Sequence, residues 1–118
     1  MKQGDVYWVV ISSSSGHEIK GKGQDQTRPC VVISPDVLNS RLRTVIVAPL
    51  TSSVQAYPFR TQVNFKGKKG EVVLDQLRAY DQNSKRFREK MGSLSVKEIN
   101  NCLEKLREIF ANFTNGYD

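Results

Sequence analysis

The order of apolar and polar residues predicts a series of short strands. Val6–Ile11 is apolar at consecutive positions and rich in β-forming residues, which is typical of a strand covered on both faces. Cys30–Ser34 predicts a second strand that ends at Pro35, with a turn or short helix after it, and Thr44–Leu50 predicts a third. The long polar stretch Ser12–Thr27 between the first two strands is a loop, and loops of this length are frequently functional.

The next part of the chain predicts a hairpin. Phe59–Phe65 alternates strictly between apolar and polar residues, so we expect a half-buried strand with Arg60 on its polar outer face. Lys66–Gly70 is a glycine-flanked turn, and Glu71–Leu74 pairs back as the partner strand. We expect Asp75–Tyr80 to extend or bend this strand.

The chain ends in a basic connector and a helix. We expect Lys85–Lys90 to form a short helical turn. Ser95–Asn112 predicts an amphipathic helix, because Ser95 and Glu98 have the spacing of a capping box and apolar residues follow at helical spacing. About six short strands and one terminal helix predict a mainly β fold, a small curled antiparallel barrel with a C-terminal helix.

Composition adds a basic charge to this picture. The 118 residues carry a net charge of +6, and their length predicts one domain that spans residues 1–118. Up to Leu94 there are 15 Lys and Arg residues against 8 Asp and Glu, so the excess belongs to the body of the chain. Such an excess favours a polyanionic partner, most often a nucleic acid, although solubility alone is an alternative reason for it.

Neither a membrane nor a disulfide is indicated. Cys30 and Cys102 lie inside apolar patterns and predict reduced, buried side chains. The Val6–Ile11 run is too short to span a bilayer, and the flank MKQGD carries no cleavable signal. We therefore expect a cytoplasmic protein with no membrane partner.

Several catalytic classes fit the sequence poorly. Gly16–Gly23 approaches the phosphate-binding loop pattern, but Gly23 stands where that loop needs a hydroxyl, and no helix follows. A single histidine, His17, and no clustered ligands predict that no metal is bound, and we expect no cofactor. A serine triad lacks its nucleophile-elbow motif. Glu71 and Asp75 could share a strand face, but we expect a solvated, hydrogen-bonded pair.

Arg28 is the most informative single residue. It stands directly before Pro29, so its backbone is held extended where the chain enters the core. A permanently charged guanidinium at that place suits anion binding, and it equally suits a surface salt bridge. Other polar residues also fall at predicted strand ends and loops: His17, Glu18, Thr51, Ser52, Arg60, Asp75 and Gln76. Hydroxyls, a guanidinium and carboxylates together could bind and strain a phosphodiester.

A series of motifs extends over nearly the whole chain. In order they are GDVYWV (Gly4–Val9), GHE (Gly16–Glu18), RPCVVISP (Arg28–Pro35), VIVAPLTS (Val45–Ser52), YPF (Tyr57–Phe59), DQLRAYD (Asp75–Asp81) and LSVKE (Leu94–Glu98). The series resembles the MazF/PemK family of bacterial toxin endoribonucleases. The resemblance implies an SH3-like barrel of the plasmid-toxin (MazF/CcdB) type, a homodimer, metal-independent cleavage of single-stranded RNA, and a MazE-like antitoxin as partner.

The resemblance also implies roles for particular residues. Arg28 matches the family's catalytic arginine and Thr51 its catalytic threonine. The resemblance implies that the ribose 2′-OH is the nucleophile and that the products carry a 2′,3′-cyclic phosphate and a 5′-OH, so DNA should resist cleavage. We expect RNA contacts from His17, Glu18, Ser52, Phe59, Arg60, Asp75 and Gln76. The candidates for the base that activates the 2′-OH are Glu18 and His17, with Asp75 a more distant one. We also expect the lysines of the Lys66–Gly70 turn to attract RNA.

Two features depart from the family pattern. The segment between Glu18 and Arg28 is several residues longer than is usual, which should alter sequence preference. Val73 stands where the PemK branch has a second arginine, so the Arg–Asp acid/base pair of that branch does not carry over whole. Two other functions use a similar barrel: a CcdB-like toxin that poisons its target by contact, and a nucleic-acid-binding barrel without catalysis. The pair Arg28 and Thr51 favours cleavage, because a pure binder has no use for it.

Overall fold

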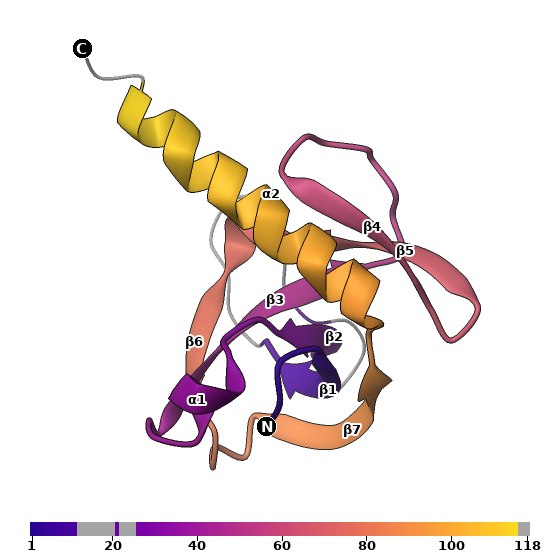
Figure 1. Ribbon diagram of the computed structural model, residues 1–118. Coiled ribbons are helices and arrows are strands. Elements are labelled where there is room, and N and C mark those ends of the chain that lie inside the picture. The colour runs from indigo at the N-terminus through magenta and orange to yellow at the C-terminus, as the bar shows by residue number, and fades with distance from the viewer. Residues whose placement is uncertain (12–20, 22–25, 116–118) are drawn as a thin grey trace.

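A computed structural model describes residues 1–11, 21 and 26–115 of the chain, which form a curled sheet crossed by a long helix (Figure 1). Within these residues there are seven strands, two α-helices and one 3₁₀ turn. In chain order they are β1 (Asp5–Val10), β2 (Thr27–Val32), α1 (Asp36–Asn39), β3 (Thr44–Thr51), β4 (Arg60–Phe65), β5 (Lys68–Val73), η1 (Leu74–Gln76), β6 (Arg78–Asp81), β7 (Phe87–Ser93) and α2 (Val96–Asn115).

The sheet is antiparallel and bends at β3. The strand order is β4-β5-β3-β2-β1-β7, and β6 also pairs with β3. The first half of β3 pairs with β6, from Thr44 to Val47, whereas its last residues, Leu50 and Thr51, pair with β5. Because one strand belongs to two ladders, the sheet curls into a half-barrel, and α2 lies across it (Figure 1). The predicted curled antiparallel fold with a C-terminal helix is confirmed.

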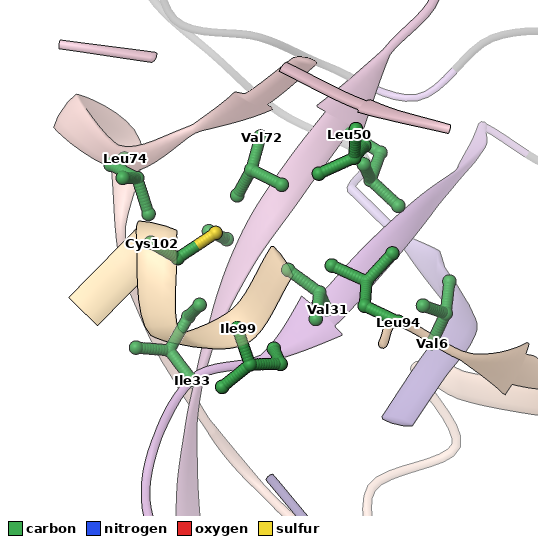
Figure 2. Close-up of a cluster of buried hydrophobic side chains, with 11 residues drawn as sticks. Val6, Val31, Ile33, Leu50, Val72, Leu74, Leu94, Ile99 and Cys102 are labelled. Carbon is green, nitrogen blue, oxygen red and sulfur yellow. The ribbon is translucent and has the colours of Figure 1, made fainter. Parts of the chain in front are cut away.

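Two apolar cores lie on opposite sides of the curled sheet. The helix-side core lies beneath α2 (Figure 2), and its buried residues are Val6, Val31, Ile33, Ala48, Leu50, Val63, Val72, Leu74, Leu94, Ile99 and Cys102. The second core contains Val9, Ile11, Cys30, Val32, Val45 and Val47. Strand β1 contributes to both cores, so the prediction that it is covered on both faces is confirmed.

The N-terminus of α2 confirms the predicted capping box. The Glu98 backbone N–H donates to Ser95 Oγ at 3.1 Å, and the Ser95 N–H donates to Glu98 Oε1 at 3.0 Å. The second carboxylate oxygen of Glu98 accepts the Asn64 N–H at 2.8 Å, which links the helix to β4. Burial acts to raise the pKa of Glu98, but these backbone and Ser95 hydrogen bonds outweigh it and leave that pKa below its usual value.

The hairpin formed by β4 and β5 is also confirmed, but its turn is shorter than the predicted Lys66–Gly70, because β5 begins at Lys68. Its two turn residues, Lys66 and Gly67, have φ angles of 52° and 76°, as the tight turns that suit twisted strands require. Thr61 and Val63 are buried, while Gln62 and Asn64 are exposed, in agreement with the alternation in the sequence. After β5 the chain bends through η1, and β6 then pairs with β3.

The helical turn predicted at Lys85–Lys90 is wrong, because most of that segment belongs to β7, which pairs with β1. Phe87 packs edge-on against Tyr7 and Tyr80, at ring-centroid distances of 6.0 and 6.2 Å, and this contact orients the strand. Residues Arg88, Glu89 and Lys90 are exposed. The pairing partner lies about 80 residues away in sequence, so the local charge pattern carried no sign of it.

The start of the second strand also differs from the prediction. Strand β2 begins at Thr27, so Arg28 and Pro29 lie inside it and not at its entrance. They pair with Val9 and Trp8 of β1, which explains the longer strand. Among the helices of the described residues, none combines the length and the apolarity that crossing a membrane requires.

Candidate active site

Arg28 and Thr51 meet at one pocket of about 570 Å³. Strands β2 and β3 pair Cys30 with Pro49, and the same register, continued, places Arg28 level with Thr51. The Arg28 Nη1 group donates a hydrogen bond to the carbonyl oxygen of Leu50, 3.2 Å away, which holds the guanidinium beside the end of β3. The structure thus brings together two residues 23 positions apart in the sequence.

The pocket combines an apolar floor with a basic rim. Its apolar lining comes from Trp8, Pro29, Leu50, Val63, Phe65 and Met91, on five different strands. Lys66, Lys68 and Lys69 of the β4–β5 hairpin form the rim on one side. Apolar and aromatic side chains suit the faces of nucleobases, and cations suit the phosphates that link them.

Burial changes the electrostatics of this pocket. Desolvation lowers the pKa of Arg28, and the nearby positive charge of Arg78 acts in the same direction. Arginine nevertheless stays charged at neutral pH, so an incompletely hydrated cation lies beside Thr51. Burial raises the pKa of Cys30 to about 12 against the opposing effects of Arg78 and Arg28, so its thiol is protonated and is no nucleophile.

Thr51 is held by its own turn and by a glycine. Its Oγ1 accepts the Ser53 N–H at 3.2 Å, so the hydroxyl proton can be donated elsewhere. A Cβ on Gly70 would lie 2.8 Å from the Thr51 carbonyl oxygen, so only glycine permits this approach of β5 to β3. Sequence reasoning did not select Gly70, because it assigned this glycine to the Lys66–Gly70 turn, whereas Gly70 lies inside β5.

Ser52 lines the same pocket, whereas other predicted site residues lie elsewhere. Asp75 is exposed on η1, Gln76 is half-buried there, and neither lines the pocket. Phe59 is 50% exposed just before β4. His17 and Glu18 lie outside the described residues, so their positions stay predictions.

Arg60 lies in different surroundings from those predicted. Its side chain is only 14% exposed, and Nη1 lies 3.5 Å from Oε1 of Glu71. Its guanidinium also lies over the ring of Tyr57, 4.9 Å from the centroid. It lines a second cavity, of about 380 Å³, between β4 and α2. The expectation of an outward Arg60 fails because its counter-ion on β5 is inside the protein.

The expectation of a solvated pair of Glu71 and Asp75 is also wrong. Glu71 lies in β5 with no exposed surface, whereas Asp75 is on the following turn and exposed. Within the described part of the chain, no group of three or more His, Cys, Asp or Glu residues could hold a metal ion.

Comparison with known proteins agrees with the fold. The family model of PemK-like, MazF-like toxins of type II toxin-antitoxin systems matches residues 2–110. A relative from Staphylococcus saprophyticus named endoribonuclease MazF is 34% identical over 113 residues, covering 88% of each chain. A relative of the same name from Staphylococcus epidermidis is 33% identical, with the same coverage.

Solved structures show the same fold. The crystal structure of MazF from Deinococcus radiodurans has a TM-score of 0.75 and 26% identity, and the match covers 94% of this chain and 96% of that one. A MazE-MazF structure from the same organism has a TM-score of 0.71 and 22% identity, with 93% and 94% coverage. This mainly β half-barrel with its C-terminal helix is therefore of the MazF type. The chain belongs to the family of PemK-like, MazF-like toxins of type II toxin-antitoxin systems.

Proposed function

We propose that this toxin is an endoribonuclease that cleaves single-stranded RNA in the pocket of Arg28 and Thr51. The observation that carries the proposal is the convergence of these two side chains on a pocket with an apolar floor and a lysine rim. The names of the two staphylococcal relatives, both endoribonucleases, support the same reaction.

The proposed reaction is a transesterification within the RNA. The 2′-oxygen attacks the adjacent phosphorus as it loses its proton, the bond from phosphorus to the 5′-oxygen breaks, and that oxygen takes up a proton. The products are a 2′,3′-cyclic phosphate and a 5′-OH, so the substrate supplies the nucleophile and no metal is required. DNA lacks the 2′-OH and resists this reaction.

Arg28 and Thr51 have separate tasks in this mechanism. The guanidinium of Arg28 binds two phosphate oxygens and stabilises the additional negative charge of the pentacoordinate transition state. The partial desolvation that lowers its pKa also strengthens this interaction, because the site has fewer water dipoles to screen it. The hydroxyl group of Thr51 donates a hydrogen bond to a non-bridging oxygen of the phosphate.

The remaining residues serve binding and proton transfer. The lysine rim holds neighbouring phosphates, and the apolar floor accepts a base. A guanidinium keeps its proton at neutral pH and is therefore a poor base, so another group accepts the 2′-proton. We retain Glu18 and His17 as the candidates for this base, with Asp75 as a more distant one, and Ser52, Phe59 and Gln76 as further RNA contacts. Arg60 is left out because its guanidinium is mostly buried against Glu71 and Tyr57.

We also propose a MazE-like antitoxin as partner, a homodimer as the functional unit and a cytoplasmic site of action. Solved relatives include MazE-MazF structures from D. radiodurans and a mycobacterial endoribonuclease in complex with its cognate antitoxin. Those assemblies support the antitoxin for this chain.

The experiment is cleavage of a long single-stranded RNA by the purified protein in excess EDTA. The controls are an Arg28→Ala variant, a DNA of the same sequence and an RNA with a single 2′-deoxy residue at a mapped cleavage position. Fragments that end in cyclic phosphate, formed only by the wild type and only at 2′-OH residues, are the expected result. Intact RNA would overturn the proposal in favour of a toxin that acts by contact.

A further inference from the structure

Glu71 is the one fully buried carboxylate among the described residues. It lies in β5 directly opposite Thr51, and none of its surface is exposed. Its carboxylate accepts the backbone N–H of Gln55 at 2.8 Å and the N–H of Ala56 at 3.0 Å. The carboxylate therefore binds two consecutive amides of the loop formed by residues 52–59.

A buried carboxylate of this kind contributes little to stability by itself. Removing an ion pair from water costs roughly what the pair returns, and an apolar pair of similar size is often as stable. The pair with Arg60 is loose, at 3.5 Å, and Arg60 Nε is buried without a hydrogen-bond partner among the described residues. The main contribution of the Glu71 carboxylate is therefore the loop conformation that it stabilises.

That conformation is one the loop would not favour alone. Ala56 has a φ of 55°, in the left-handed region that residues with a Cβ rarely adopt. Glu71 accepts the N–H of this same residue, so its carboxylate stabilises the bend. In Figure 1 the loop arches away from the end of β3 and returns at the start of β4.

The bend presents two aromatic side chains to solvent. Tyr57 is 53% exposed and Phe59 is 50% exposed, and the guanidinium of Arg60, itself bound to Glu71, lies against the Tyr57 ring. The loop starts at Ser52, which lines the pocket of Arg28 and Thr51. Exposed aromatic rings on a loop that begins at such a pocket suit the unpaired bases of a single strand.

We propose that Glu71 is a positioning residue for substrate: it holds residues 52–59 so that Tyr57 and Phe59 stack on an unpaired base of the RNA beside the cleaved phosphate. This inference rests on the proposed endoribonuclease function. It assigns Glu71 to RNA affinity and sequence preference, and leaves the chemical step to Arg28 and Thr51.

The test compares Glu71→Gln, which keeps the size of the side chain, with the wild type on an RNA that contains one cleavage site. We expect KM to rise about tenfold, the value of one base stacked on an aromatic ring, while kcat stays within about twofold. The matched control is Gln62→Ala, because Gln62 pairs with Glu71 across the hairpin but is exposed. It should change neither constant.

Two further measurements separate positioning from general damage to the fold. Hydrogen exchange of the free protein should accelerate at the Gln55 and Ala56 amides in Glu71→Gln and stay unchanged in the helix-side core. Tyr57→Ala should raise KM when it is the only substitution. In the Glu71→Gln background it should raise KM little further, because the Tyr57 ring is then already misplaced. If Glu71→Gln does not fold, the double variant Arg60→Gln with Glu71→Gln, which leaves no unpaired charge, replaces it.

The outcomes are distinct. Faster exchange at the two amides, a higher KM and non-additive loop variants support the inference. An unchanged KM and cleavage pattern, or effects of Glu71→Gln and Tyr57→Ala that simply add, overturn it while cleavage by the wild type upholds the proposed function. A wild type that leaves RNA intact overturns both.

Discussion

Arg28 and Arg60 both stand near the start of a strand, and both were predicted to contact substrate, but they lie in contrasting surroundings. Arg28 lies beside Thr51 in a pocket bordered by three lysines. Arg60 is bound to the buried Glu71 and covers the ring of Tyr57. The lesson is that the strand opposite decides what an arginine does: β3 brings a hydroxyl to one arginine, and β5 brings a carboxylate to the other.

The largest effect should come from Arg28. Arg28→Ala should lower kcat about 10³-fold, as the loss of a principal transition-state contact does. Arg28→Lys should retain only a small part of the wild-type kcat, because an ammonium cannot bind two oxygens in the same plane. Single-turnover cleavage measures both. The melting temperature should stay near that of the wild type, and full activity in Arg28→Ala would remove the proposed mechanism.

Arg60 should show the opposite pattern. Arg60→Ala leaves Glu71 buried with only its two amide partners, so the protein should lose about 2 kcal/mol of unfolding free energy. At saturating RNA its kcat should stay within about threefold of the wild type, since Arg60 does not line the Arg28 pocket. Urea unfolding measures the expected loss of stability, and cleavage assays measure kcat. A loss of kcat comparable with that of Arg28→Ala would mean that the two arginines act together.

The lysine rim gives a smaller and graded effect. Replacing Lys66, Lys68 and Lys69 with Gln should weaken RNA binding and lower the slope of log K against log salt by about 2, since single strands lose about 0.7 per phosphate contact. Lys105→Gln on α2 is the control, because Lys105 is bound to Glu108 away from this pocket. An unaltered slope in the triple variant would place the hairpin off the RNA path.

The smallest effect is the pH dependence of stability that comes from Glu98. It should not change the different roles of Arg28 and Arg60. The pKa of Glu98 is lowered in the folded protein, so its contribution to stability is present above the usual value of 4.5 and is lost as pH falls through the folded pKa. Glu98→Gln should melt about 4 °C below the wild type at neutral pH, as for loss of a cap. The difference should shrink below pH 4.5, and a constant difference would contradict this account.

The elements that could be predicted from the sequence are those with a local signal. The capping box of α2 and the alternation of β4 depend on neighbours within a few residues, and both are confirmed. Strand β7 was missed, because its partner β1 lies at the other end of the chain. Burial of Glu71 was missed for a similar reason, since its amide partners are 15 and 16 residues away.

The candidate site was predictable in its polar members and less so in its floor. Arg28, Thr51 and Ser52 were selected by their motifs, and all three line one pocket. Trp8 and Met91 were not selected, because an apolar residue that lines a pocket has the same local pattern as one in a core. Only the pairing of β1 with both β2 and β7 brings them to the site.

The two cysteines offer a way to time the opening of the molecule. Cys30 belongs to the second core and Cys102 to the helix-side core, and burial raises their pKa values to about 12 and about 11. Neither thiol reacts with an alkylating reagent while its core is closed, because the reactive thiolate is absent and the sulfur is covered. The labelling rate of each cysteine therefore reports the opening of its own core. The order in which the two thiols are labelled shows which core of the toxin opens first.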